Sequence, residues 1–224
     1  MTAAQNTSAV DVRDMLVVHT ALLREFRLAP AAVRRVRDAD TRQRDRVDEH
    51  LELLCTLMHH HHEGEDELLW PLLRERLTGE DAAMLDVVEA QHAGIDTALT
   101  RVEDARSGWC EAVDATTTRR LASALEDLFD SLRDHLEVEE RSVLPLAAVH
   151  LEPAEWHAVG EAGAASVPKS AMPLVIGMFA YEGDPAVLRD MLRPAPAPIR
   201  VLVPRIAPRV YARRALAVHG TRTP

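Results

Sequence analysis

The chain has 224 residues and a net charge of −10, with 47% hydrophobic but only 4% aromatic residues. This length suits one substantial domain with an appendage. The charge is uneven, because residues 194–224 hold six Arg and no Asp or Glu, which leaves −16 on the rest of the chain. This strongly negative charge argues against a general nucleic-acid-binding function.

Ala, Leu, Arg and Glu dominate the composition, and Gly is scarce before residue 160, which favours an all-α fold. The chain has two cysteines, Cys55 and Cys110, which form no CxxC motif. This cysteine usage indicates a reduced, intracellular protein. The first fifteen residues lack the apolar core of a signal peptide. The longest apolar run, residues 172–181, is about half the length that spans a bilayer. We therefore expect a cytoplasmic protein without a membrane partner.

Hydrophobic periodicity predicts four long helices within residues 1–150. They cover residues 11–28, 41–77, 81–107 and 116–149. Pro30 is expected to end the first helix, and Pro71 to kink or tighten the second. Long helices with short connections predict an up-down-up-down four-helix bundle.

The inward positions of the last three helices step mainly by four and three residues in alternation, as in the seam of a helix bundle. In the second helix they are Val47, Leu51, Leu54, Met58, His61, Glu65, Leu68 and Leu72. In the third they are Asp81, Leu85, Val88, His92, Ile95, Leu99 and Val102. In the fourth they are Leu121, Leu125, Leu128, Leu132, His135, Glu139, Val143 and Leu146.

Residues 151–224 differ in character from the predicted bundle. Asp184 and Pro185 suit a helix start, and a Pro-rich break then precedes a basic amphipathic segment over residues 199–218. We expect a C-terminal helical extension that packs on the bundle, and no second domain. A basic amphipathic segment can also lie on an anionic membrane surface, but packing on its own domain with Arg outward is the commoner arrangement.

Six ionisable side chains interrupt the apolar seams of the four helices. They are His19, His61, Glu65, His92, His135 and Glu139. The pattern occurs twice, because His61, Glu65 and Pro71 have the same spacing as His135, Glu139 and Pro145. A buried imidazole or carboxylate is costly unless it is paired, hydrogen-bonded or bound to a metal. Two matched copies therefore favour one metal site built from several helices.

The spacing within a bundle explains how these side chains could share ions. Neighbouring helices lie roughly 8–10 Å apart, so inward side chains at one level can converge. Four residues rise about 6 Å along a helix, so one helix can offer His to one ion and Glu as a bridge to a second. Mixed imidazole and carboxylate ligands suit iron, and less selectively manganese or zinc. The absence of a nearby thiolate argues against copper(I) and iron–sulfur clusters.

The segments VVHTALLREF, HHHHEGEDELLWP, EAQHAGIDTAL and DHLEVEERSVLP together resemble haemerythrin-like (HHE cation-binding) domains over about residues 11–150. The resemblance implies a four-helix bundle with a non-haem di-iron centre, oxo- or hydroxo-bridged, that binds dioxygen, peroxide or nitric oxide. It implies that His19, His61, His92 and His135 are terminal ligands and that Glu65 and Glu139 bridge the two irons. Manganese and zinc are less suitable cofactors.

The sequence departs from the oxygen-carrying members of that family. Those have a second His on the third helix, where this chain has Val88 and Asp96, and an Asp on the fourth helix where it has Glu139. Six ligand residues and a shared oxygen leave roughly two of about twelve iron coordination positions open. We take this to favour reactive or sensing chemistry over oxygen carriage.

Several alternatives stay open on the sequence alone. The protein could be a di-iron enzyme of the peroxidase or oxidase type, or an iron-responsive regulatory or storage module. His62 is the next candidate ligand, although a polar helix face explains His59, His60 and His62 without any metal. Asp66 and Glu140, which follow the two bridging Glu, are candidate hydrogen-bond partners of the ligands. A small ligand is expected to occupy an apolar pocket. That pocket would comprise Leu22, Phe26, Ile95, Phe129 and Leu132.

Overall fold

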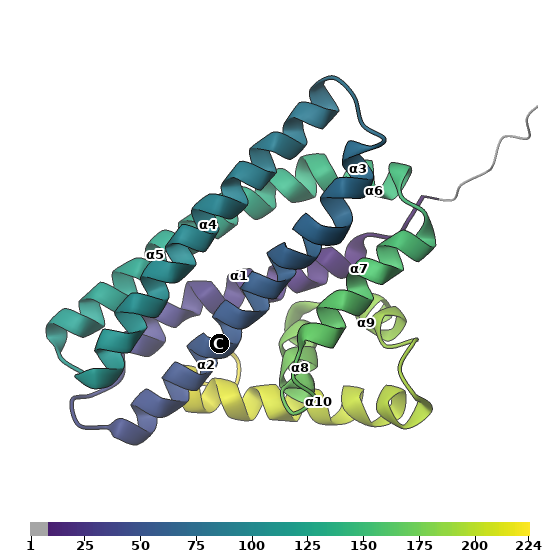
Figure 1. Ribbon diagram of the computed structural model, residues 1–224. Coiled ribbons are helices and arrows are strands. Elements are labelled where there is room, and N and C mark those ends of the chain that lie inside the picture. Colours follow the sequence, from purple (N-terminus) through teal and green to yellow (C-terminus); the bar gives the residue numbers. More distant parts are fainter. Residues whose placement is uncertain (1–8) are drawn as a thin grey trace, which may run out of the picture.

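The computed structural model describes residues 9–224, and residues 1–8, which belong to the expected first domain, lie outside the described part. Every regular element among the described residues is a helix, as predicted. The four long helices of the predicted bundle region are α1 (Arg13–Arg34), α2 (Thr41–Gly64), α4 (Glu80–Glu111) and α5 (Ala115–Val138). Both α1 and α4 pack against α2 and α5, so the four helices surround a common core (Figure 1).

The first helix is longer than we predicted. It continues through Pro30 and ends at Arg34, so the expectation that Pro30 would terminate it is wrong. A proline removes one backbone donor from a helix. Here the segment around it is buried in the core, with Ala29 and Val33 at 0% exposure, and this burial offsets the missing hydrogen bond.

The second and fourth predicted helices each contain one wide turn. After α2 comes a π-helical turn, η1 (Glu65–Leu69), and then α3 (Trp70–Arg74). After α5 comes a second π-helical turn, η2 (Glu139–Val143), and then α6 (Leu144–His150). Both wide turns begin at the Glu of the repeated motif and end two residues before its Pro. Because Pro cannot donate to the preceding turn and crowds its carbonyl, a wider turn relieves both conflicts.

A wide turn adds one residue and so shifts every inward position that follows it. The buried positions are Leu69, Leu73 and Ala147, in place of the predicted Leu68, Leu72 and Leu146. The three predicted side chains are only half-buried, one residue before the fully buried positions, because α-helical spacing does not hold through a π-helical turn. The prediction that Asp81 faces inward is wrong, because this residue is exposed at the start of α4. The other apolar seam positions are buried as predicted.

The C-terminal segment forms four further helices. They are α7 (Pro153–Ser166), α8 (Met172–Glu182), α9 (Pro185–Met191) and α10 (Ala197–His219). α8 packs on α1 and α10, and the end of α10 reaches α2, where the C-terminus lies (Figure 1). None of the helices in residues 9–224 combines the length and the apolar character needed to cross a membrane.

The buried apolar residues form two separate clusters. The large apolar cluster includes Phe26, Leu128 and Trp109 of the long helices together with Met178 and Tyr211 of the extension. The small apolar cluster lies at the other end of the four long helices. It includes Leu69, Trp70, Leu85, Val143 and Trp156. The extension therefore contributes side chains to both clusters, Trp156 from α7 to the small one and the α8 and α10 residues to the large one.

The crossing of α8 and α10 depends on Gly177. A Cβ at this position would lie 2.8 Å from the Cβ of Tyr211 and would clash with the carbonyl oxygen of Ala207. We expect Gly177→Ala to reduce the free energy of unfolding by about 1–3 kcal/mol, because overpacking displaces α10 from α8. Urea denaturation measures this change.

Gly160→Ala is the matched control for that substitution. Gly160 is exposed in α7, and a Cβ there would meet no atom within 4 Å. This control should stabilise the helix by roughly 0.5–1 kcal/mol, because Ala has the higher helix propensity. Equal effects of the two substitutions would show that α8 and α10 do not depend on their close approach.

Candidate metal centre

The six side chains that the sequence predicts as metal ligands converge inside the ring of four long helices. They are His19 of α1, His61 of α2, Glu65 of η1, His92 of α4, His135 of α5 and Glu139 of η2. A seventh side chain, His62 of α2, joins them. Six of the seven residues are buried, and the side chain of His61 is only 9% exposed.

These side chains form a polar layer between the two apolar clusters. On α1, His19 lies between Met15 of the small cluster and Leu22 of the large one. On α4, His92 lies between Val88 and Ile95 in the same way. The layer is therefore enclosed by apolar side chains on both sides.

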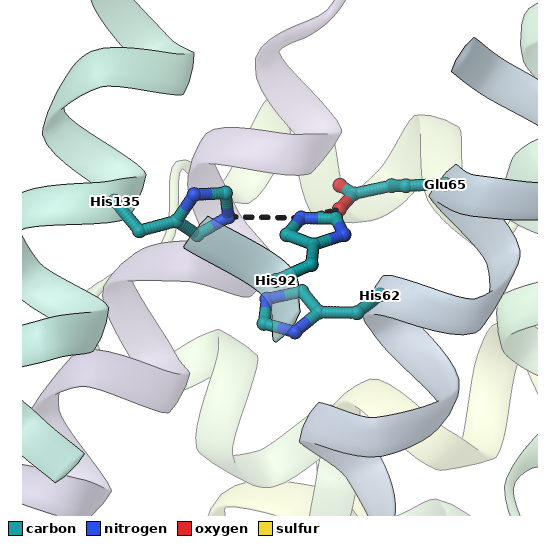
Figure 2. Close-up of side chains that lie close together, drawn as sticks. All are labelled: His62, Glu65, His92 and His135. Carbon is teal, nitrogen blue, oxygen red and sulfur yellow. Dashed lines mark hydrogen bonds and ion pairs between the residues drawn. The ribbon is translucent and has the colours of Figure 1, made fainter. Parts of the chain in front are cut away.

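The seven side chains fall into two groups that share Glu65. The first group contains His62, Glu65, His92 and His135 (Figure 2). The second contains His19, His61, Glu65 and Glu139. Within each group the atoms that could bind a metal all lie within 4.8 Å of one another. Each group is thus compact enough to hold one cation.

Both carboxylates face histidines of both groups. Glu65 lies with Oε1 3.4 Å from Nε2 of His61 and with Oε2 3.5 Å from Nε2 of His92. Glu139 lies with Oε2 3.6 Å from Nε2 of His19 and 3.7 Å from Nε2 of His135. A carboxylate that bridges two cations needs this placement.

Hydrogen bonds at the outer edge of the layer orient three of the imidazoles. Nδ1 of His19 lies 3.0 Å from Glu140 Oε1, and Nδ1 of His92 lies 2.8 Å from Asp66 Oδ1. Nδ1 of His135 lies 3.2 Å from the side-chain oxygen of Gln91. A proton donated from Nδ1 to these oxygens leaves the Nε2 lone pair directed inward, as a metal ligand requires. Asp66 and Glu140 thus occupy the supporting positions we expected for them.

Many polar atoms of this layer have no hydrogen-bond partner although they are buried. They are Nε2 of His19 and His61, both ring nitrogens of His62, and both carboxylate oxygens of Glu65 and Glu139. Each such atom costs about 1–3 kcal/mol when it stays unpaired. Cations bound between the carboxylates and imidazoles would satisfy them, so the residues present fit a metal centre made of nitrogen and oxygen ligands.

Burial shifts the protonation of these groups in opposite directions. It raises the pKa of Glu65 well above its usual value, and the neighbouring Glu139 adds to this effect. It also raises the pKa of Glu139. Burial lowers the pKa of His61 and His62, and that of His135 to about 3. These three imidazoles are therefore neutral at pH 7, which is the form that binds metals.

His62 is buried in the central layer, although the predicted inward positions of the second helix do not include it. Only His61 falls on the α-helical seam, yet His62 is 2% exposed and its ring stacks on His92 with centroids 4.0 Å apart (Figure 2). The interpretation of His62 as part of a polar helix face is therefore wrong. His59 is exposed and His60 bonds to Glu63, so those two lie outside the layer.

The sequence contained a signal for His62. It stands three residues before Glu65 and His61 stands four before it, so both imidazoles lie within one helical turn of that carboxylate. The third predicted helix offers only one inward His, and this shortage pointed to an extra ligand elsewhere.

Loss of an outer hydrogen-bond partner of a metal ligand weakens metal binding by roughly 10–100-fold. We expect His62→Ala to weaken binding of the cation in the first group by more than this. The reason is that three side chains would remain in that group, and Glu65 is shared with the other. Competition with a chelator measures the affinity. His60→Ala, which removes a half-exposed imidazole two residues away, should leave it unchanged. Equal affinities in both variants would exclude His62 from the centre.

The comparison with known protein families agrees with this geometry. The profile of the family described as Hemerythrin HHE cation binding domain matches residues 10–147, well over half of the chain. No curated protein and no solved structure matches the chain. The matched segment contains all seven converging side chains, and it confirms the resemblance found in the motifs. The chain therefore belongs to the haemerythrin HHE cation-binding domain family.

Proposed function

We propose that the chain is a non-haem di-iron protein that binds dioxygen, peroxide or nitric oxide. The centre would lie inside an up-down-up-down four-helix bundle, with residues 151–224 as an extension of the same folded unit. The observation that carries the proposal is the pair of histidine groups joined by Glu65 and Glu139, since each carboxylate faces a histidine of each group. The donor set of imidazoles and carboxylates supports iron over copper(I).

The seventh side chain alters the expected openness of the centre. With His62 as a ligand, the coordination positions left open on two irons fall from roughly two to about one of about twelve. Reactive chemistry was expected because the third helix lacks a second His, and His62 of α2 would supply a ligand in its place. Reversible binding of a small molecule is therefore the function that the residues support best.

The residues around the layer have clear roles in this proposal. Bound iron would supply the redox chemistry of the centre. Asp66, Glu140 and Gln91 hold the Nδ1 protons of three ligands and keep their Nε2 atoms inward. The apolar side chains expected to form a pocket exclude water from the large-cluster side. Leu22, Phe26, Ile95 and Leu132 are buried there, and Phe129 is half-buried.

The free cysteines support a reducing compartment. Neither Cys55 nor Cys110 is in a disulfide, as is usual in cytoplasmic proteins. We therefore propose a cytoplasmic location, where the small ligand would reach the centre by diffusion.

Metal analysis joined to visible absorption of aerobically purified protein tests the function. We expect two irons per chain and charge-transfer bands of an oxygen-bridged pair. Protein that holds only zinc, or no metal, and cannot be reconstituted with iron would refute a di-iron centre. Steady consumption of peroxide would instead support the alternative of a peroxidase.

A further inference from the structure

A second buried cluster of potential metal ligands lies away from the central layer. It contains Glu25 of α1, His50 of α2 and His219 at the end of α10. Glu25 and His50 are buried, and the side chain of His219 is 5% exposed. None of the three belongs to the seven side chains of the central layer. The cluster therefore needs an explanation of its own.

The three ligand atoms converge on one point. Oε2 of Glu25 lies 3.0 Å from Nε2 of His50 and 3.3 Å from Nε2 of His219. The two imidazole rings meet edge to face, with centroids 5.5 Å apart and an interplanar angle of 82°. His19 and His61 in the central layer have nearly the same arrangement, at 5.1 Å and 82°.

The other oxygen of Glu25 is already satisfied by the protein. Oε1 accepts hydrogen bonds from the hydroxyl of Tyr211 at 2.6 Å and from Nε and Nη2 of Arg24 at 3.0 and 2.9 Å. These bonds fix the plane of the carboxylate and turn Oε2 towards the two imidazoles. Both oxygens of the Glu25 carboxylate therefore have defined neighbours.

We propose that Glu25, His50 and His219 bind one divalent cation of the zinc class, with water at the fourth position. Two imidazoles and one carboxylate form a set that zinc accepts, with bonds of about 2.0–2.2 Å. Tetrahedral ligands at that bond length are separated by about 3.3 Å. The separations of Oε2 from the two Nε2 atoms, 3.0 and 3.3 Å, are close to this value.

The charges around the cluster suit a cation. Burial would raise the pKa of Glu25, but hydrogen bonds from His219, His50 and Tyr211 lower it far below its usual value, so the carboxylate is ionised. Burial lowers the pKa of His50, which keeps its imidazole neutral. Three Arg side chains lie nearby, and two of them have acidic partners outside the cluster, whereas Arg35 donates a hydrogen bond to the carbonyl oxygen of His219. Arg24 pairs with Glu182 at 3.0 Å, and Arg214 with Glu49 at 3.5 Å.

A bound cation would tie the extension to the helices of the central layer. His219 is near the end of the chain, whereas Glu25 and His50 belong to α1 and α2, which also carry His19 and His61. The competing explanation is that both imidazoles simply donate N–H to Oε2, which would fasten the same three helices without an ion. The experiment must separate these two cases.

His219→Gln in the full-length protein makes this separation. The Gln amide can still donate a hydrogen bond to Oε2 of Glu25, but it is a poor zinc ligand. After saturation with zinc and removal of the excess, we expect the wild type to retain one more ion per chain than His219→Gln. His157→Gln is the control, because His157 is 53% exposed in α7, and it should retain the wild-type number.

A second variant keeps the test decisive if His219→Gln does not fold. His50→Gln should lose the same single ion, and the double variant should lose no more than either single one. These are differences between variants, so they do not depend on which metal fills the central layer. Equal zinc contents in the wild type and both folded variants would overturn the proposal and leave a hydrogen-bonded junction only.

Discussion

Replacing His135 by Ala is expected to remove the cation of the first group and to destabilise the folded protein strongly. His135 is completely buried, and its Nε2 lies 3.1 Å from Nε2 of His92 and 3.7 Å from Glu139. It is thus a member of one group and also faces the carboxylate of the other. A ligand present at a hundred times its dissociation constant stabilises a fold by about 2.7 kcal/mol. We expect His135→Ala to lower the free energy of unfolding by at least about that amount.

His59→Ala is the matched control, because His59 is exposed on the same tract that supplies His61 and His62. It should change stability by less than about 0.5 kcal/mol and leave the metal content intact. Iron content and urea denaturation, each with and without a chelator, measure both effects. The chelator should narrow the gap between wild type and His135→Ala, because both proteins then lack the cation. Equal losses in the two variants would contradict a centre built on the inward residues.

Glu25→Ala should destabilise the protein by about 3–5 kcal/mol, the usual cost of removing one partner of a buried ion pair. The substitution removes the buried one of the two carboxylates that pair with Arg24, which is 3% exposed, and leaves only the half-exposed Glu182; it also removes the acceptor of the Tyr211 hydroxyl. Chelator in the buffer keeps this measurement independent of any ion. Glu126→Ala, which breaks the exposed pair with Arg34, should cost at most about 1 kcal/mol.

The effect of Glu25→Ala should also depend on pH. The folded pKa of Glu25 lies below its ordinary value of 4.5, so the stabilising effect of its charge is fully present above that pH. It is lost as the pH falls towards the folded pKa, because the unfolded chain takes up the proton first. Denaturation at pH 7 and at pH 3.5 should therefore give a smaller difference between wild type and variant at the lower pH. A constant difference would mean that Glu25 acts through packing alone.

Local spacing was enough to predict most of the fold and of the central layer. Apolar positions that step by four and three residues placed the four helices and directed His19, His61, His92 and His135 inward. The same spacing does not hold where the helix changes its geometry. Beyond Glu65 and Glu139 the turn is wider, so the predicted inward positions Leu68 and Leu146 were each one residue early.

The second cluster could not be predicted because no local pattern encodes it. Glu25, His50 and His219 are separated by 25 and 169 residues in the chain. Their meeting depends on how α10 folds back across α1 and α2, and that path is determined by packing such as the contact of Gly177 with α10. Pro30 is a similar case. Local sequence does not reveal that the residues around it are buried, and this burial allows α1 to continue past it.

The polar layer separates the large apolar cluster, which contains Trp109, from the small one, which contains Trp156. The two clusters are separate, and in the four long helices they meet across the side chains of the central layer. We therefore expect the cooperativity of unfolding to depend on what fills that layer. With cations bound, the two ends are joined by coordinate bonds and should unfold as one unit. Without cations, we expect the end around Trp156, which belongs to the smaller cluster, to unfold before the end around Trp109.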